Sequence, residues 1–212
     1  MISASFLTSK DIPKTLAELN NTDVDFIHVD VMDGKYVENK SLPFKEMRHI
    51  YKFTDKRLDV HLMVSKPSKY IINYASLNTE YITIHLDTLE ETLNNLKLIK
   101  SYGIKAGIAL NPNDEVSFLI PYLPYIDLIL VMGVIPGKGG QKFINSTIDK
   151  LKELKVLKKE YKEFNFKVSV DGGINNLVAK KIHNLTDIIV SGNYITSSTD
   201  FQKQINSLRN FS

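Results

Sequence analysis

Short apolar runs alternate with longer amphipathic stretches along all 212 residues of the chain. The apolar runs are rich in Ile, Val and Leu, and they occupy eight segments: 2–6, 26–30, 58–63, 81–84, 106–110, 128–132, 167–170 and 188–191. A segment with a helical pattern follows each run, at 11–20, 43–52, 67–76, 88–102, 114–120, 145–162, 174–183 and 199–210. This alternation predicts βαβ units around a parallel sheet.

The number of units distinguishes two kinds of α/β fold. Eight units with no change of composition along the chain predict a (β/α)8 TIM barrel, with one domain over residues 1–212. The alternative is an open doubly wound sheet, which usually has fewer strands and often carries G-x-G-x-x-G after its first strand. No such turn follows Phe6, so the barrel is preferred.

Composition excludes several classes of protein. The chain has 27 Lys and Arg, 24 Asp and Glu, and 43% hydrophobic residues, which are ordinary values for a folded protein. It has no Cys, which rules out disulfides, a thiolate nucleophile and Cys-ligated zinc. The pI near 8.8, without a clustered basic stripe, does not predict a nucleic-acid partner.

The chain shows no pattern for export or membrane insertion. Its first residues lack a basic segment followed by an apolar one. The longest apolar run, 128–136, is interrupted by Gly133 and is too short to span a bilayer. We therefore expect a cytoplasmic protein that does not contact membranes.

Asn stands where three predicted helices end, within residues 19–23, 77–80 and 183–187. Asn tolerates the left-handed conformation of a helix C-cap, and Gly103 is expected to take the same role after 88–102. These signals concern structure and carry no chemistry.

Ligand-type residues cluster at the predicted strand ends, which face the active site in a barrel. Period-two alternation places His28 and Asp30 on one face of their strand, and Asp59 and His61 on one face of theirs. Asp171 ends the seventh strand. Two imidazoles and two carboxylates from three strands suit a divalent ion such as Zn²⁺ or Fe²⁺.

Each residue also has a plain structural interpretation. A single histidine is usually a hydrogen-bonded structural residue, and His49 and His183, on predicted helices, are assigned that way. Asp59, one pleat below His61, is expected inside the barrel and hydrogen-bonded. The pair Asp33-Gly34 is consistent with a simple turn, and the methionines at 32, 63 and 132 with core packing. Four ligand-type residues at independent strand ends nevertheless favour a site.

Three neighbouring βα loops are rich in glycine: residues 133–141 after the sixth strand, Gly172-Gly173 after the seventh, and Gly192-Asn193 after the eighth. Barrels commonly bind phosphate there, on backbone N–H groups and on a short extra helix, for which residues 194–196 are a candidate. Ordinary glycine-rich turns are the alternative. Three adjacent loops favour the phosphate site.

These motifs resemble the ribulose-phosphate 3-epimerase family. The resemblance is carried by Ser5-Phe6-Leu7, the stretches 28–34, 59–64, 82–85, 107–112 and 131–143, Val170-Asp171-Gly172-Gly173 and Val190-Ser191-Gly192. They fall on every predicted strand, so the resemblance covers essentially the whole chain. It implies a ribulose-phosphate-binding barrel that interconverts D-ribulose 5-phosphate and D-xylulose 5-phosphate in the pentose phosphate pathway.

The resemblance also implies roles for individual residues. His28, Asp30, His61 and Asp171 match metal ligands, and Asp30 and Asp171 match the two catalytic carboxylates, acting through an enediolate. Substrate contacts are implied for Ser5, Met32, His61, Met63, Met132, Gly137, Lys138, Gly139, Gly140, Asp171, Gly172, Gly173, Gly192 and Asn193. One divalent ion per subunit is implied, Zn or Fe first and Mn or Co as alternatives, in a homo-oligomer.

Several positions depart from the family pattern: Glu38 stands for a usual Pro, Gly133 for Thr or Ser, Lys138 for Phe, and Asn193 for Ser, and the stretch 39–43 lacks the usual Gly-Pro. None removes a ligand or a catalytic carboxylate, so they bear on sugar preference and loop packing.

Three alternatives remain at this point. An epimerase of a related sugar such as D-allulose 6-phosphate would use the same groups, and a non-catalytic phosphate-binding barrel would use only the loops. Metal-free decarboxylases and synthases commonly rely on Lys at a strand end. Here Lys35 and Lys138 lie in loops, and His28 and His61 would have no role.

Overall fold

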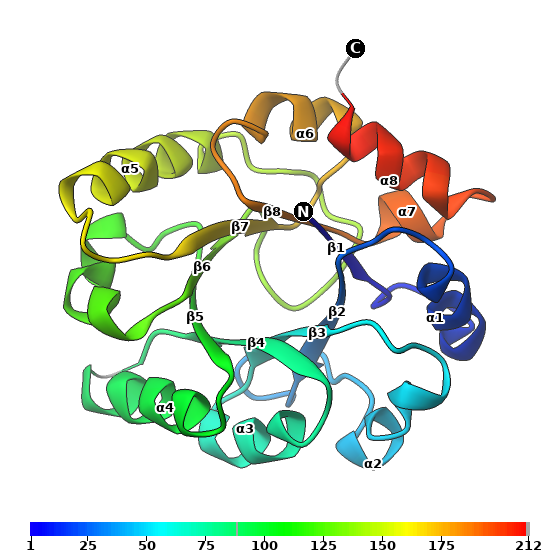
Figure 1. The fold of residues 1–212 in the computed structure, drawn as a ribbon, viewed down its shortest axis with the longest axis horizontal. Coiled ribbons are helices and arrows are strands. Elements are labelled where there is room, and N and C mark those ends of the chain that lie inside the picture. Colours follow the sequence, from blue (N-terminus) through cyan, green and yellow to red (C-terminus); the bar gives the residue numbers. More distant parts are fainter. Residues whose placement is uncertain (88, 211–212) are drawn as a thin grey trace.

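The computed structural model describes residues 1–87 and 89–210, and its strands form a closed barrel in sequential order (Figure 1). The strands are β1 (Ile2–Ser5), β2 (Phe26–Met32), β3 (Leu58–Met63), β4 (Thr79–His85), β5 (Lys105–Leu110), β6 (Leu128–Met132), β7 (Lys167–Asp171) and β8 (Ile188–Ser191). Every neighbouring pair is parallel, and β1 pairs with β8 to close the sheet. The predicted TIM barrel is confirmed.

Helices surround the barrel on the outside (Figure 1). They are α1 (Ile12–Asn20), α2 (Phe44–Met47), α3 (Pro67–Ala75), α4 (Leu89–Ser101), α5 (Thr147–Glu160), α6 (Asn176–Ile182), α7 (Asn193–Thr196) and α8 (Phe201–Arg209), with 3-10 helices at Ile50–Lys52 and Val116–Tyr125. Within residues 1–87 and 89–210, no helix has the length and apolar character needed to cross a membrane.

Two helix predictions need correction. The segment 43–52 is split into α2 and a 3-10 turn instead of one helix. The segment predicted as a helix over 114–120 is a 3-10 helix that extends to Tyr125 and contains Pro121 and Pro124. Proline lacks the backbone N–H that an α-helix interior requires, which explains the different hydrogen-bond pattern. The predicted start at residue 88 lies outside the described residues.

The Asn C-cap prediction was also wrong. No described residue other than glycine has a positive φ, and Asn21 caps α1 with φ −83°. Asn20, the last residue of α1, instead links this helix to the loop before β3, because its side-chain oxygen accepts hydrogen bonds from Thr54 Oγ1 (2.9 Å) and Asp55 N (3.0 Å). Gly103 does adopt the left-handed conformation after α4, with φ +74°.

Three aspartates repeat one contact at the N-terminal end of the barrel. Asp25, Asp127 and Asp187 precede β2, β6 and β8, and their carboxylates accept the backbone N–H of Ile2 (2.7 Å), Ala106 (2.9 Å) and Val168 (2.8 Å) on the preceding strand. The backbone N–H of each aspartate in turn donates a hydrogen bond to the backbone carbonyl of the residue that its carboxylate contacts. Each carboxylate also pairs with a cation in the last turn of a helix, Arg209, Lys100 and Lys158 respectively.

The barrel interior changes from apolar to polar along its axis. At the N-terminal end Phe26, Tyr81, Leu128 and Ile188 form one cluster, with one residue from each even-numbered strand. Higher in the barrel the buried carboxylate of Asp59 accepts a hydrogen bond from Ser3 Oγ at 2.8 Å. The polar side chains thus accumulate toward the C-terminal ends of the strands, where the site lies.

Candidate functional site

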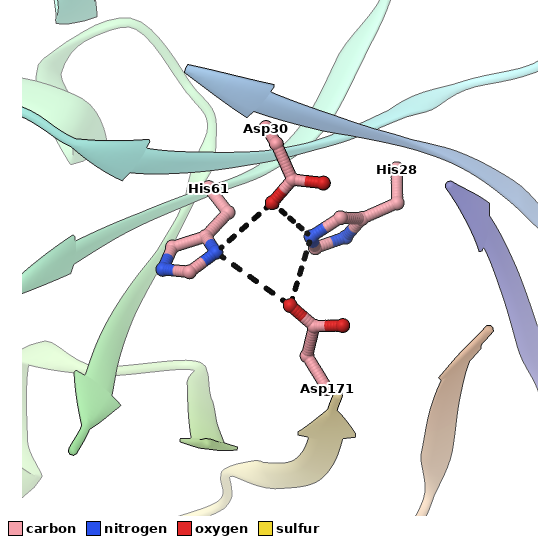
Figure 2. Close-up of side chains that lie close together, drawn as sticks. All are labelled: His28, Asp30, His61 and Asp171. Atoms are coloured by element: carbon pink, nitrogen blue, oxygen red, sulfur yellow. Dashed lines mark ion pairs between the residues drawn. The ribbon is translucent and has the colours of Figure 1, made fainter. Parts of the chain in front are cut away.

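Four ligand-type side chains converge inside the C-terminal mouth of the barrel (Figure 2). They are His28 and Asp30 from β2, His61 from β3 and Asp171 from β7, and one ligand atom from each lies within 4.8 Å of the others. Figure 2 shows both carboxylates between the two imidazoles. Asp30 Oδ1 lies 3.5 Å from His28 Nε2 and 3.4 Å from His61 Nδ1, and Asp171 Oδ2 lies 3.8 Å from the same two nitrogens.

The donor atoms of this cluster fit a divalent cation. His28 Nε2 and His61 Nδ1 are buried and have no hydrogen-bond partner. Buried polar atoms are normally satisfied, so two unpartnered nitrogens aimed at the same two carboxylates require an explanation. Two imidazole nitrogens and two carboxylate oxygens are a ligand set typical of Zn²⁺ or Fe²⁺.

The outer nitrogens of both imidazoles are held by other side chains. His28 Nδ1 lies 2.9 Å from Asp59 Oδ2, as expected for an Asp59 that is hydrogen-bonded inside the barrel. His61 Nε2 lies 2.8 Å from Nε2 of His85, at the end of β4. Metal-ligating histidines commonly make such bonds through their second nitrogen, and these bonds orient the ring.

Burial and neighbouring charges set the ionisation of the metal-free cluster. Burial raises the pKa of Asp171 to about 6, and the nearby carboxylate of Asp30 adds to the effect against the opposing attraction of the two histidines. Burial also opposes ionisation of Asp30, but His28 and His61 lower its pKa well below the usual range. The carboxylates of Asp59 and Asp30 overcome desolvation and raise the pKa of His28 well above its ordinary value.

A cavity of about 300 Å³ opens beside the cluster. Its lining includes both carboxylates and the three glycine-rich loops: Ser5, Leu7, Thr8, Asp30, Met132, Val134, Lys138, Gly139, Gly140, Gln141, Asp171, Gly172, Gly173, Ile174, Asn175, Val190, Gly192, Asn193, Tyr194 and Ser197. Lys138 is the one cationic side chain among these lining residues. One concave space therefore joins the carboxylates to a group of loops suited to an anion.

Four of the five lining glycines, at positions 139, 172, 173 and 192, cannot carry a side chain without displacing a neighbour. Gly173 has φ +69°, and an added Cβ would lie 2.8 Å from Phe143 Cα and 2.9 Å from Gln141 O. An added Cβ at Gly192 would lie 3.3 Å from Cβ and O of Ser5. Gly192 also begins α7, the short helix predicted near residues 194–196. Because these positions lack side chains, the backbone lies close to the cavity, as phosphate binding by backbone N–H groups requires.

Not every predicted substrate residue lines this cavity. Met132 does, whereas Met32 and Met63 are buried and are not among its lining residues. Gly137 lines a neighbouring cavity with residues 34–39 and 111–113, and Lys138 lines both. His61, which belongs to the cluster, is also absent from the lining. All of the substrate contacts stay predictions.

Other predicted residues have clear structural roles. Ser5 Oγ donates to Asp30 Oδ2 at 3.0 Å, so Ser5 orients one carboxylate. His183 Nδ1 contacts the Lys180 carbonyl at 2.8 Å and His49 contacts Arg48, and neither histidine belongs to the cluster.

Sequence reasoning assigned no role to His85 or Tyr36, although His85 was visible at a strand end. Tyr36 is placed by the Asp33-Gly34 turn. Asp33 accepts the backbone N–H of Lys35 (2.8 Å) and of Tyr36 (2.9 Å) with one oxygen, and Ser65 N and Oγ with the other. Asp33 thereby joins the loops that follow β2 and β3.

Comparison with known proteins agrees with the geometry. A model of the ribulose-phosphate 3 epimerase family matches residues 1–196. The ribulose-phosphate 3-epimerase of Bacillus subtilis (strain 168) is 32% identical over 210 residues, covering 99% of this chain and 95% of the relative. That of Helicobacter pylori (strain J99) is 37% identical over 214 residues, covering 99% and 94%.

A solved structure, 3-hexulose-6-phosphate synthase from Salmonella typhimurium, matches with a TM-score of 0.70 and 16% identity, over 98% of this chain and 95% of that chain. At that identity the likeness concerns the fold alone. The matches in sequence identify the family: the chain belongs to the ribulose-phosphate 3-epimerase family and is an epimerase.

Proposed function

We propose that this protein interconverts D-ribulose 5-phosphate and D-xylulose 5-phosphate by moving a proton at C3. The observation that carries this proposal is the position of Asp30 and Asp171, whose carboxylates line the same cavity and come from strands β2 and β7 of the barrel. Inverting a carbon next to a ketone requires one group to remove its proton and another to return a proton to the opposite face.

Each carboxylate has a support that suits this task. Ser5 Oγ holds one oxygen of Asp30, so the other oxygen is directed toward the centre of the cluster. Asp171 ends β7 and is followed directly by the glycine turn at 172–173. In one direction Asp30 would take the C3 proton and Asp171 would supply one, and in the other direction the roles would exchange, with an enediolate between the two steps.

A divalent ion, Zn or Fe first, would be held by His28, Asp30, His61 and Asp171. When bound, it would act as a Lewis acid for the negative charge that develops on the substrate oxygens, an effect worth several kcal/mol. The apolar side chain of Met132 lines the same cavity as the carboxylates and would limit the access of water to them.

The substrate phosphate would bind at the glycine-rich end of the cavity. Residues 172–173 and 192–193, the latter at the start of α7, line this end, and their backbone N–H groups would bind the phosphate oxygens. Lys138 would add the single side-chain cation there. A phosphorylated ketose held at both ends of this one cavity would place its carbon chain beside the two carboxylates.

The test is an assay of the purified protein on D-ribulose 5-phosphate and on D-allulose 6-phosphate, with metal content measured in the same sample. Preference for the pentulose supports the proposal. Preference for the hexulose would mean that the substrate is D-allulose 6-phosphate, with the proposed mechanism unchanged. Turnover of neither sugar would favour a non-catalytic phosphate-binding protein.

Two variants test the mechanism itself. Asp30→Asn and Asp171→Asn are each expected to abolish epimerisation, while the carboxylate that remains still exchanges solvent deuterium into one of the two sugars. Glu38→Gln, an exposed carboxylate of the neighbouring cavity, is the control. Because both aspartates are proposed metal ligands, activities are compared only between samples that contain bound metal. A metal-loaded Asp171→Asn enzyme with near-parent turnover would refute the use of two carboxylates.

A further inference from the structure

Three aromatic rings are stacked from the centre of the barrel toward its surface. His61 lies innermost, with its ring centroid 5.0 Å from that of His85 and an interplanar angle of 34°. The ring of Tyr36 also packs against His85, with the centroids 4.8 Å apart and an interplanar angle of 36°. His61 and His85 are 0% and 5% exposed, whereas Tyr36 is 36% exposed. The stack therefore connects the proposed metal centre to the loop that follows β2.

The hydrogen bond between the two histidines determines which nitrogen carries each proton. His61 directs Nδ1 at Asp30 and Asp171, so a metal bound there would require Nδ1 to be unprotonated. The proton of a neutral His61 then resides on Nε2, which lies 2.8 Å from His85 Nε2. His85 must accept this hydrogen bond, and its own proton resides on Nδ1.

We propose that His85 is a positioning residue of the metal centre, because it accepts the hydrogen bond of His61 Nε2–H and thereby keeps His61 Nδ1 free to bind the ion. This inference rests on the proposed metal site. The two ligand imidazoles are then supported differently: Asp59 holds His28 with a carboxylate, and His85 holds His61 with a neutral ring.

Contacts outside the barrel hold His85 in place through Tyr36. The backbone N–H of Tyr36 donates to Asp33 Oδ1 at 2.9 Å, and its hydroxyl accepts from Asn111 Nδ2 at 3.3 Å. The carbonyl of Asn111 in turn accepts from Lys150 Nζ, on α5, at 2.7 Å. Contacts with the loops after β2 and β5, and through Asn111 with α5, thus fix the position of Tyr36, whose ring contacts His85.

Removing the acceptor should weaken metal binding without unfolding the protein. In His85→Leu the Nε2–H of His61 loses its partner inside the barrel, so the ring is free to rotate or to place its proton on Nδ1. Loss of such a partner typically lowers metal affinity about 10–100-fold. His85→Gln retains an acceptor oxygen and should stay within about threefold of the parent. His183→Gln, on the surface beyond α6, is the matched control.

The experiment measures the zinc dissociation constant of the four proteins by competition with a chromophoric chelator, together with thermal unfolding of the metal-free forms. We expect zinc affinity to fall in His85→Leu, to stay close to that of the parent in His85→Gln, and to be unchanged in the control. Zinc affinity of His85→Leu within twofold of the parent would overturn the inference. If that variant does not fold, nitrogen-15 NMR of the zinc-loaded parent decides: a proton on His61 Nε2 supports the inference, and its absence there overturns it.

These outcomes separate the inference from the proposed function. A parent that binds zinc and shows the loss in His85→Leu, yet turns over neither sugar, would refute the function and support the positioning role. A parent that binds no zinc would overturn the positioning role, whatever its activity.

Discussion

Nδ1 of His28 lies 2.9 Å from Oδ2 of Asp59, and neither side chain is more than 2% exposed. The same carboxylate oxygen accepts a hydrogen bond from Ser3 Oγ. A fully buried carboxylate of this kind fixes the imidazole so that Nε2 faces the cavity, and it makes the imidazole a stronger electron donor.

Asp59→Asn should therefore weaken metal binding although Asp59 touches neither metal nor substrate. An amide can keep the contact with His28 but supplies no charge, so we expect the zinc dissociation constant to rise about 10–100-fold. Chelator competition measures this constant. Ser3→Ala, which removes only the second hydrogen bond on Asp59, is the control and should have a smaller effect. Equal affinity in Asp59→Asn and the parent would contradict the role given to Asp59.

The strand ends of the site could be predicted from sequence because the period of a strand is two residues. Once β2 and β3 were recognised, His28, Asp30 and His61 had to face the barrel interior, and the register of β2 on β3 pairs Asp30 with His61. Because this reasoning needs no loop geometry, it correctly predicts that these side chains lie together. The assignment of metal and substrate to these side chains stays a prediction.

Contacts that depend on loop conformation could not be predicted. The hydrogen bond between Tyr36 and Asn111 joins residues 75 positions apart, and the two loops meet only after the barrel closes. The Asn C-cap after α1 fails locally: Asn21 has φ −83°, and its backbone N–H still reaches the carbonyls of Glu18 and Leu19, so no left-handed residue follows that helix.

Metal binding should weaken as the pH falls through about 6. In the metal-free protein burial raises the pKa of Asp171 to about 6, and the carboxylates around His28 raise its pKa well above the ordinary value. Both groups must lose a proton to bind a cation, so protons compete with the metal at low pH and are released on binding. Zinc affinity measured at pH 5, 6 and 7 should rise with pH at each step. An affinity independent of pH over this range would contradict the ligand assignment.

Gly173→Ala should raise KM for the sugar phosphate. Its φ of +69° disfavours any side chain, and the added Cβ would collide with the backbone of Phe143 and displace the loop at the proposed phosphate end. Gly103→Ala is a matched control, because Gly103 has φ +74° with nothing within 4 Å and lies on the outer surface after α4. We expect both variants to lose stability and only Gly173→Ala to raise KM, by more than about tenfold, as steady-state kinetics would show. An equal KM in the two variants would place the phosphate elsewhere.

Lys138→Met should raise KM with little change in kcat. Lys138 is the single cationic residue among the lining residues, and it is exposed to solvent. The lost attraction for a phosphate at an exposed position corresponds to about 1 kcal/mol, or roughly fivefold in KM. Because salt screens exposed charges, the parent KM should rise with ionic strength more steeply than that of the variant. Lys142→Met, four residues along the same loop and outside the lining, is the control. Identical salt dependence in parent and Lys138→Met would exclude contact of Lys138 with the phosphate.

The stability of the barrel should depend on the backbone contacts of its repeated aspartates more than on their ion pairs. Asp127 accepts the N–H of Ala106 and pairs with Lys100, which is 39% exposed in its side chain. Asp127→Asn keeps an acceptor for Ala106 and removes the charge, so it should cost less than about 1 kcal/mol. Asp127→Ala leaves the N–H of Ala106 without a partner, which should cost about 1–3 kcal/mol. Urea unfolding measures the free energy of unfolding of both variants, provided that its dependence on urea concentration has the same slope as in the parent. Asp149→Asn, which breaks the exposed pair with Lys152, should have no measurable effect. Equal losses in Asp127→Asn and Asp127→Ala would show that the charge, and not the backbone contact, stabilises this end of the barrel.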